Sequence, residues 1–205
     1  MSGFDFWGAC KAAISIDSTS EHGNVEYVEF LKTILEKFDL SVRTQQVSSG
    51  GYHGLNLIGE KGGGPDVILL DTHLDTVSPG DRALWTETGG DPFRAVVKDG
   101  RIYGLGAADV KLDFLCKLKA LEKFVGRRFR NWFILLGTFG EEVGLIGAQA
   151  FLDEYPGPLD FALIGEPTSL KLVNRHKGRG CYEFRLPVDS QKEYAGVLTL
   201  EFRGE

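Results

Sequence analysis

The spacing of apolar residues along the chain predicts alternating helices and strands. Apolar residues recur at helical spacing from Val25 to Phe38, which predicts an amphipathic helix over residues 24–38. The same periodicity predicts further helices over residues 4–16, 110–125 and 145–154. Short apolar runs bounded by glycine, proline or polar residues predict buried strands at Leu40–Val47, Leu55–Gly59, Val67–Leu70, Trp132–Leu136 and Phe161–Ile164.

The order of these elements predicts an α/β fold. Strands that alternate with helices are typical of a mostly parallel central sheet flanked by helices on both faces. Residues 94–103 (RAVVKDGRIY) predict a hairpin that turns at Asp99-Gly100. After Gly180 the pattern changes to two alternating segments, 181–188 and 197–202, without a helix between them. We therefore expect one domain over residues 1–180 and the start of a smaller α+β domain over 181–205.

Composition narrows the class of protein. Hydrophobic residues make up 42% of the chain and aromatic residues 11%, which predicts a folded globular protein. The net charge of −6 argues against a nucleic-acid groove, and the cluster Arg127, Arg128 and Arg130 is interpreted as a solvated helix end. The three cysteines are far apart, so neither a disulfide framework nor a zinc knuckle is indicated. No signal peptide or long apolar run is found, so we expect a cytoplasmic protein without a membrane partner.

A histidine and an aspartate follow the most apolar of the predicted strands. The run Val67–Leu70 leads directly into Asp71-Thr72-His73-Leu74-Asp75. Residues i and i+2 of an extended backbone point the same way, so His73 and Asp75 can face one site. Ligands bind at the strand ends of open α/β sheets. Taken alone, such a pair is more often a surface histidine whose hydrogen bonds are already satisfied.

Three more segments place carboxylates at the ends of predicted elements. Asp109 stands in a glycine-rich loop before the helix 110–125, where it could also be a simple N-cap. Glu141 and Glu142 are adjacent between glycines after a strand, and a bound cation would offset their repulsion. Glu166 follows another strand. Imidazole with several carboxylates is a ligand set that suits zinc, cobalt or manganese, so together the four segments predict a metal site.

Four motifs extend this interpretation to a known family. They are DTHLDTVSPGD, WTETGGDPFRAVVKDGRIYGLGAADVK, TFGEEVGLIGAQAF and LIGEPTSLKLVNRHKGRG. In this order they resemble the metallopeptidase family that includes acetylornithine deacetylase, succinyl-diaminopimelate desuccinylase, aminoacylase and glutamate carboxypeptidase, and the resemblance covers most of residues 7–180. It implies a zinc-exopeptidase-like catalytic domain and a smaller lid domain through which such enzymes form homodimers.

The resemblance also implies a role for each candidate residue. The site would hold two zinc ions, with cobalt or manganese as alternatives, and a cis peptide would follow Asp109. The implied metal ligands are His73 and Glu166 for the first ion, Glu142 for the second, and Asp109 bridging both. The implied catalytic residues are Glu141 as the general base and Asp75 as the support of the liganding histidine.

The implied activity is hydrolysis of the amide bond of an N-acyl amino acid or small peptide, as in the deacetylases and desuccinylases of amino-acid biosynthesis. Two positions beside the ligands depart from the family, because Leu105 replaces an arginine and Leu112 a glycine. The family's histidine for the second metal and its lid histidine have no counterpart among His22, His53, His73 and His176.

We therefore expect the chain to be the N-terminal part of such a hydrolase, with little activity alone. One alternative is a metal-binding unit without catalysis. A dinucleotide-dependent dehydrogenase is disfavoured, because GLGAAD does not complete the required glycine pattern.

Overall fold

The computed structural model describes residues 3–155, 157–175, 179–185 and 197–203. The chain forms two compact units, Met1–Pro167 and Thr168–Glu205. The first unit contains a five-stranded sheet with the order β1-β2-β6-β3-β7. No helix in the described ranges is both long and apolar enough to cross a lipid bilayer.

The elements of the first unit follow the predicted pattern closely. The sheet strands are β1 (Ser41–Ser49), β2 (Tyr52–Lys61), β3 (Val67–His73), β6 (Trp132–Thr138) and β7 (Phe161–Ile164). The helices are α1 (Phe6–Ser15), α2 (Val25–Leu35), α3 (Lys111–Leu121) and α4 (Ile146–Glu154). The predicted hairpin is present as β4 (Val96–Lys98) and β5 (Arg101–Tyr103), and single 3₁₀ turns lie at Arg82–Leu84, Thr86–Thr88 and Glu122–Phe124.

The sheet is mixed, and its parallel part lies where the candidate residues are. Strand β3 runs parallel to both β6 and β7, whereas β1 with β2 and β2 with β6 are antiparallel. The β1–β2 pair is antiparallel because the two strands are joined only by Gly50 and Gly51, too short a link for a crossover. Both glycines have positive φ, 59° and 87°, as a tight hairpin turn requires. The predicted α/β class is confirmed, with an antiparallel hairpin at one edge.

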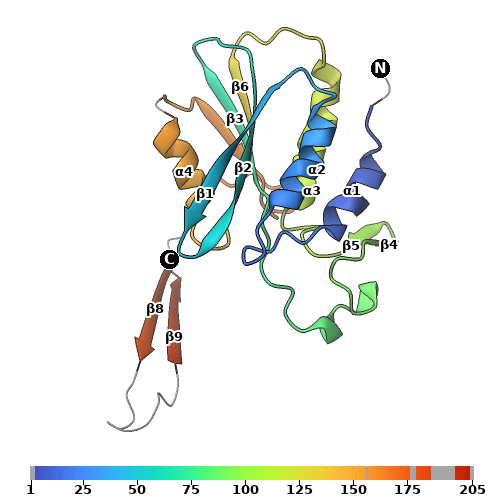
Figure 1. Cartoon of the computed structure of the whole chain (residues 1–205), viewed down its shortest axis with the longest axis vertical. Coiled ribbons are helices and arrows are strands. Elements are labelled where there is room, and N and C mark those ends of the chain that lie inside the picture. Colours follow the sequence, from blue (N-terminus) through green and yellow to red (C-terminus); the bar gives the residue numbers. More distant parts are fainter. Residues whose placement is uncertain (1–2, 156, 176–178, 186–196, 204–205) are drawn as a thin grey trace. The chain divides into compact units, whose positions relative to one another are not determined.

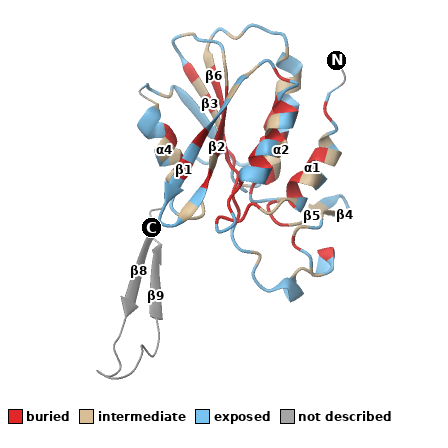
Figure 2. Ribbon diagram, in the orientation of Figure 1, coloured by how far each residue is buried: buried red, intermediate tan, exposed pale blue. Residues whose placement is uncertain are grey.

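Helices cover both faces of the sheet, with α1, α2 and α3 on one side and α4 on the other (Figure 1). Leu57 of β2 packs into the core on the side of the three helices, and its neighbour Ile58 packs on the other side with Phe151 of α4. Successive residues of β2 therefore point to opposite faces of the sheet and pack into different cores, as expected for a pleated strand. Buried residues accordingly lie along the strands and on the sheet-facing sides of the helices (Figure 2).

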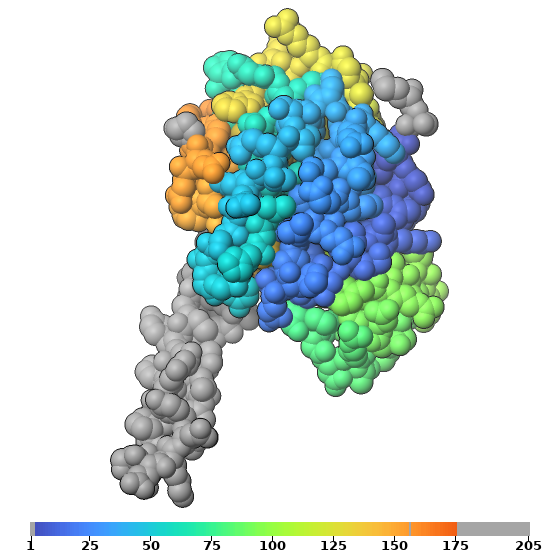
Figure 3. Space-filling model, viewed as in Figure 1, coloured from blue at the N-terminus to red at the C-terminus, as the bar shows by residue number. Residues whose placement is uncertain are grey.

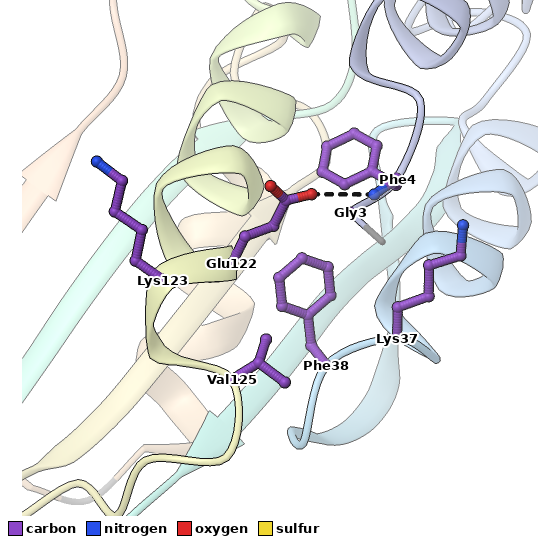
Figure 4. Close-up of a pocket in the computed structure, with 7 residues that line it drawn as sticks. All are labelled: Gly3, Phe4, Lys37, Phe38, Glu122, Lys123 and Val125. Carbon is purple, nitrogen blue, oxygen red and sulfur yellow. Dashed lines mark hydrogen bonds between the residues drawn. The ribbon is translucent and has the colours of Figure 1, made fainter. Parts of the chain in front are cut away.

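The N-terminal segment is fixed to the ends of two helices. The backbone amide of Phe4 donates to Glu122 Oε1 at 3.0 Å, and the Phe4 ring lies edge-on to Phe38. A hollow of about 350 Å³ lies between these residues, with Lys37 and Val125 also at its rim (Figure 4). The contact joins the start of the chain to the segments that follow α2 and α3.

The long connection between β3 and α3 packs beside the segment that follows α1. A parallel bridge pairs Thr19 with Thr76, and the amide of Ser20 donates to the carbonyl of Thr76 at 3.0 Å. Lys111 Nζ donates to the carbonyl of Ile16 at 2.6 Å. Figure 3 shows this connection (green) against the N-terminal residues (blue).

The second unit contains β8 (Arg179–Arg185) and β9 (Val197–Arg203), which pair in antiparallel register from Arg179 opposite Arg203 to Arg185 opposite Val197. These are the two strands predicted after Gly180. Residues 186–188 of the first predicted strand lie outside the described residues. The assignment of residues 181–205 to the start of a lid domain stays a prediction.

Leu57 tests the packing between the sheet and the three helices. We expect Leu57→Ala to lower the free energy of unfolding by about 2–5 kcal/mol, because the side chain is fully buried and leaves a cavity. Leu84→Ala is the matched control, since Leu84 is 79% exposed, and should change it by less than about 0.5 kcal/mol. Urea unfolding followed by circular dichroism measures the free energy of unfolding of both variants. Equal decreases would show that Leu57 does not lie in the core.

Candidate metal centre

The candidate residues meet at the carboxyl ends of the three parallel strands. His73, the last residue of β3, lies opposite Thr138, the last residue of β6. On its other side β3 pairs with β7 up to Asp71 opposite Ile164. The segments carrying Glu141, Glu142 and Glu166 therefore leave the sheet at the same edge as His73. This shared edge agrees with the sequence analysis, whereas the sharing of one ion by His73, Asp109 and Glu166 stays a prediction.

His73 is held by both of its ring nitrogens. The side chain is buried, and Nδ1 lies 2.9 Å from the backbone carbonyl of Asp75. A carbonyl only accepts, so Nδ1 carries the proton and donates it there. Nε2 lies 3.0 Å from Asp109 Oδ1. The partner of Nε2 is a carboxylate, which also only accepts, so Nε2–H donates to Asp109 when the imidazole is protonated. When that proton leaves, the lone pair of Nε2 points the same way, which is the orientation a metal ligand needs.

Asp75 is fully buried and joins His73 to the loop that follows β6. Its carboxylate accepts a hydrogen bond from Ser20 Oγ at 2.7 Å and from the amides of Glu141 and Glu142 at 3.2 and 3.4 Å. Its Oδ1 lies 3.7 Å from His73 Nδ1. Burial alone would raise the pKa of Asp75, but these neighbours lower it below its usual value. The carboxylate therefore stays ionised and fixes the loop.

Ser20 is a site residue that sequence reasoning missed. It lies in the segment IDSTSEHG after α1, where nothing in the spacing distinguishes it from an ordinary loop serine. Only the parallel bridge between Thr19 and Thr76 brings it to Asp75.

Asp109 does not cap helix α3. The N-cap is Val110, which makes no side-chain cap hydrogen bond, so the simple capping interpretation of Asp109 is wrong. The Asp109 side chain is 54% exposed and reaches His73 from the loop. The peptide bond between Asp109 and Val110 is cis, as the resemblance implied.

Three potential ligands lie together in the described part of the chain. One ligand atom each of His73, Asp109 and Glu142 lies within 4.8 Å of the other two. Ligands about 2.0–2.1 Å from a tetrahedral zinc are roughly 3.4 Å apart, so His73 Nε2 and Asp109 Oδ1, which lie 3.0 Å apart in a hydrogen bond, would need to separate by only about 0.4 Å to share one ion. One imidazole and two carboxylates also match the ligand chemistry of zinc, so these residues fit the implied metal.

Glu141 and Glu166 stand outside this group of three. Glu141 is half-buried and is held by its backbone amide, whereas the Glu166 side chain is exposed. Glu166 is nevertheless within electrostatic range, because burial and the charges of Glu141 and Asp109 raise its pKa against the opposing effect of His73. The structure thus brings every candidate to one edge of the sheet without bringing Glu166 within 4.8 Å of both His73 and Asp109.

The cluster concentrates negative charge around one imidazole. Burial and the charge of Glu141 raise the pKa of Glu142. Burial lowers the pKa of His73, but Asp75 together with Glu141 and Glu166 outweighs it and raises the pKa to about 10. Such a cluster favours a cation, which could be a proton or a metal ion. The pKa values of Glu142 and Glu166 are both raised, first by burial and then by the neighbouring carboxylates.

The loop between β6 and α4 needs a glycine to form. Gly140 has a φ of 78°, and a Cβ at this position would overlap the side chain of Ile146. The turn allows the amides of Glu141 and Glu142 to point at Asp75, which places both carboxylates at the site.

Sequence comparison finds proteins that are similar to this chain over most of its length. The chain is 35% identical over 164 residues to acetylornithine deacetylase of Vibrio parahaemolyticus, which covers 80% of this chain and 42% of the relative. It is 37% identical over 165 residues to acetylornithine deacetylase of Photorhabdus laumondii, with coverages of 80% and 40%. The chain thus spans well under half the length of these relatives.

Solved structures share the fold at low sequence identity. The M20 family metallo-carboxypeptidase Sso-CP2 from Sulfolobus solfataricus superposes with a TM-score of 0.60 at 18% identity, covering 79% of this chain and 37% of that one. Human carnosine dipeptidase 1 gives a TM-score of 0.58 at 19% identity, with coverages of 78% and 38%. The sequence model of Peptidase family M20/M25/M40 matches residues 69–194, which include every candidate site residue. The chain therefore belongs to Peptidase family M20/M25/M40.

Proposed function

We propose that this chain carries the metal-binding and proton-transfer residues of an amide hydrolase that acts on an N-acyl amino acid or small peptide. The observation that carries the proposal is the close approach of His73 Nε2, Asp109 Oδ1 and a Glu142 oxygen in a member of a peptidase family. The names of the relatives, acetylornithine deacetylases and a dipeptidase, support this substrate class.

The proposed ligands would hold two zinc ions, with Asp109 shared between them. His73 and Glu166 would complete the first position, and Glu142 would belong to the second. Because bridged ions in such centres lie about 3.5–4 Å apart, a Glu142 oxygen within 4.8 Å of His73 is compatible with this assignment. Glu166 is exposed at the same edge of the sheet.

In this proposal the protein's own side chains position the reacting groups and transfer the proton. Bound metal would supply Lewis acidity, which polarises the amide carbonyl and makes water more acidic. Glu141 takes the proton of the attacking water and passes it to the departing amine. Asp75 keeps the amide of Glu141 in place and holds the imidazole of His73 in the tautomer that leaves Nε2 free.

Glu141 is suited to proton transfer because its neighbour takes the ligand role. Glu141 and Glu142 begin a turn, in which the amides of Gly144 and Leu145 donate to the carbonyl of Glu141, so the side-chain alternation of an extended strand does not apply to them. Glu142 is in the group of potential ligands and Glu141 is not. This difference supports separate roles for the two carboxylates.

We also propose that the 205-residue chain alone hydrolyses little. Within the described residues, His73 is the one histidine in a group of potential metal ligands. His53 is exposed and bonds to Ser48 at 2.8 Å. The second metal position therefore has carboxylates but no nitrogen ligand from these residues. A place in amino-acid biosynthesis, a cytoplasmic location and a homodimer formed through the second unit belong to the same proposal.

The alternative function is metal binding without catalysis. Release of free amine from a panel of N-acetyl and N-succinyl amino acids and dipeptides, with added zinc or cobalt, distinguishes the two. Turnover that depends on metal would support the hydrolase and contradict the proposed low activity of the chain alone. If no substrate is cleaved even in a longer form that supplies the remaining M20 region, the hydrolase proposal fails.

His73 tests the metal position. We expect the wild-type chain to bind about one zinc ion tightly and a second weakly, and His73→Ala to weaken the tight site by at least about 100-fold. This is more than the roughly 10–100-fold that the loss of an outer hydrogen-bond partner costs. His53→Ala is the matched control and should bind as the wild type does, because His53 lies outside the cluster. Titration calorimetry measures all three, and unchanged affinity in His73→Ala would mean that the metal lies elsewhere.

The two adjacent glutamates provide a matched pair for the assignment of roles. We expect Glu141→Gln to keep zinc binding, while Glu142→Gln removes the weak second site. Where turnover can be measured, Glu141→Gln should lower it by about 10²–10⁴-fold, the usual effect of losing a general base. Calorimetry and the amine-release assay give the two readouts. Loss of zinc together with retained turnover in Glu141→Gln would reverse the assignment.

A further inference from the structure

Three polar side chains join strand β3 to helix α3 next to the candidate ligands. Thr72 Oγ1 donates to Asp113 Oδ2 at 2.5 Å. Lys117 Nζ donates to Thr72 Oγ1 at 2.7 Å and lies 2.5 Å from Asp113 Oδ2. Lys117 Nζ also donates to the backbone carbonyl of Asp71. We call Thr72, Asp113 and Lys117 the polar clamp.

The burial of the polar clamp sets it apart from an ordinary pair on a helix surface. Thr72 is fully buried, and the side chain of Lys117 is 8% exposed. Removing an ammonium group from water is costly unless its donors are satisfied. Lys117 has three N–H groups and three acceptors within reach, so its position is fully determined by the polar clamp and Asp71.

The polar clamp fixes the segments that carry the first two ligands. Thr72 immediately precedes His73, so its side chain anchors the end of β3 where the imidazole begins. Asp113 lies in the first turn of α3, and its amide donates to the carbonyl of Val110 at 2.9 Å. Because Val110 follows Asp109, the polar clamp links the backbone of both residues whose side chains meet at 3.0 Å.

The polar clamp also contacts the segment that carries Glu166, another proposed ligand. The carbonyl of Asp71, which Lys117 binds, accepts a second hydrogen bond from the amide of Gly165 at 2.9 Å. A Cβ on Gly165 would overlap Asp113 Oδ2, so the backbone before Glu166 packs directly against the polar clamp. A side chain larger than hydrogen at position 165 would displace either Asp113 or Glu166.

We propose that the polar clamp is a positioning device for the metal site. It sets the distances between the three ligand-bearing segments, while none of its members needs to touch metal or substrate. The inference rests on the proposed metal-binding function of His73 and Asp109. It assigns a role to a buried lysine that the chemistry of hydrolysis does not use.

Zinc titration of the full 205-residue chain tests the positioning role. Lys117→Met and Thr72→Val should each weaken zinc binding at the tight site by about tenfold or more. This is the usual effect of losing a residue that supports a metal ligand without touching the metal. The double variant should be no weaker than Lys117→Met, because both substitutions break one network. Gly165→Ala, which disturbs the polar clamp through Asp113, should weaken zinc binding in the same direction.

Lys61→Met is the matched control. Lys61 is also a largely buried lysine, 12% exposed, and pairs with Asp39 at 2.5 Å, but it lies at the end of β2 next to Phe133, away from the carboxyl ends of the parallel strands. Its loss should change stability and leave zinc affinity unchanged. Urea unfolding of every variant separates stability from affinity, and Thr72→Val and Gly165→Ala carry the test if Lys117→Met does not fold.

The outcomes separate this inference from the proposal on which it rests. Equal zinc affinities in Lys117→Met, Thr72→Val, Gly165→Ala and Lys61→Met would overturn the positioning role while leaving the metal site intact. If the wild type binds no zinc, or if His73→Ala binds as the wild type does, the proposed function fails and the inference fails with it.

Discussion

The parallel pairing of β3 with both β6 and β7 is the constraint on which the rest of the site depends. It places His73, at the end of β3, at the edge from which the chain leaves β6 towards Glu141 and β7 towards Glu166. An antiparallel neighbour would send one of these segments to the other end of the sheet. Buried Asp75 then converts this shared edge into a defined geometry, because it binds the loop after β6 and lies beside the imidazole.

Much of the fold could be predicted from the sequence, because the spacing of apolar residues reflects which side of a helix or strand is buried. The apolar spacing that ends at Phe38 predicted α2, and the run Val67–Leu70 predicted a buried strand with chemistry at its end. The mixed sheet was harder to predict, because only one neighbour of β2 is local in the sequence. Its antiparallel neighbour β1 directly precedes it, but the other antiparallel neighbour, β6, begins some seventy residues later.

The supports of the site could not be predicted, because they are formed by tertiary contacts alone. Ser20 has no local signature, and its bond to Asp75 follows from the bridge between Thr19 and Thr76. Asp113 and Lys117 have the i, i+4 spacing of a common surface pair, so only the neighbouring strand reveals that the lysine is buried. The proposed ligands were predicted from their positions after strands or before a helix and from the family motifs. Their supports follow the particular packing of this chain.

The central claim is that a metal ion binds between β3 and the loop before α3. X-ray diffraction from crystals grown with zinc, recorded above and below the zinc absorption edge, tests this claim most directly. The account predicts an anomalous peak about 2.0–2.2 Å from His73 Nε2 and from an Asp109 carboxylate oxygen. An anomalous map without a peak at His73, or with its main peak at another histidine, would contradict it.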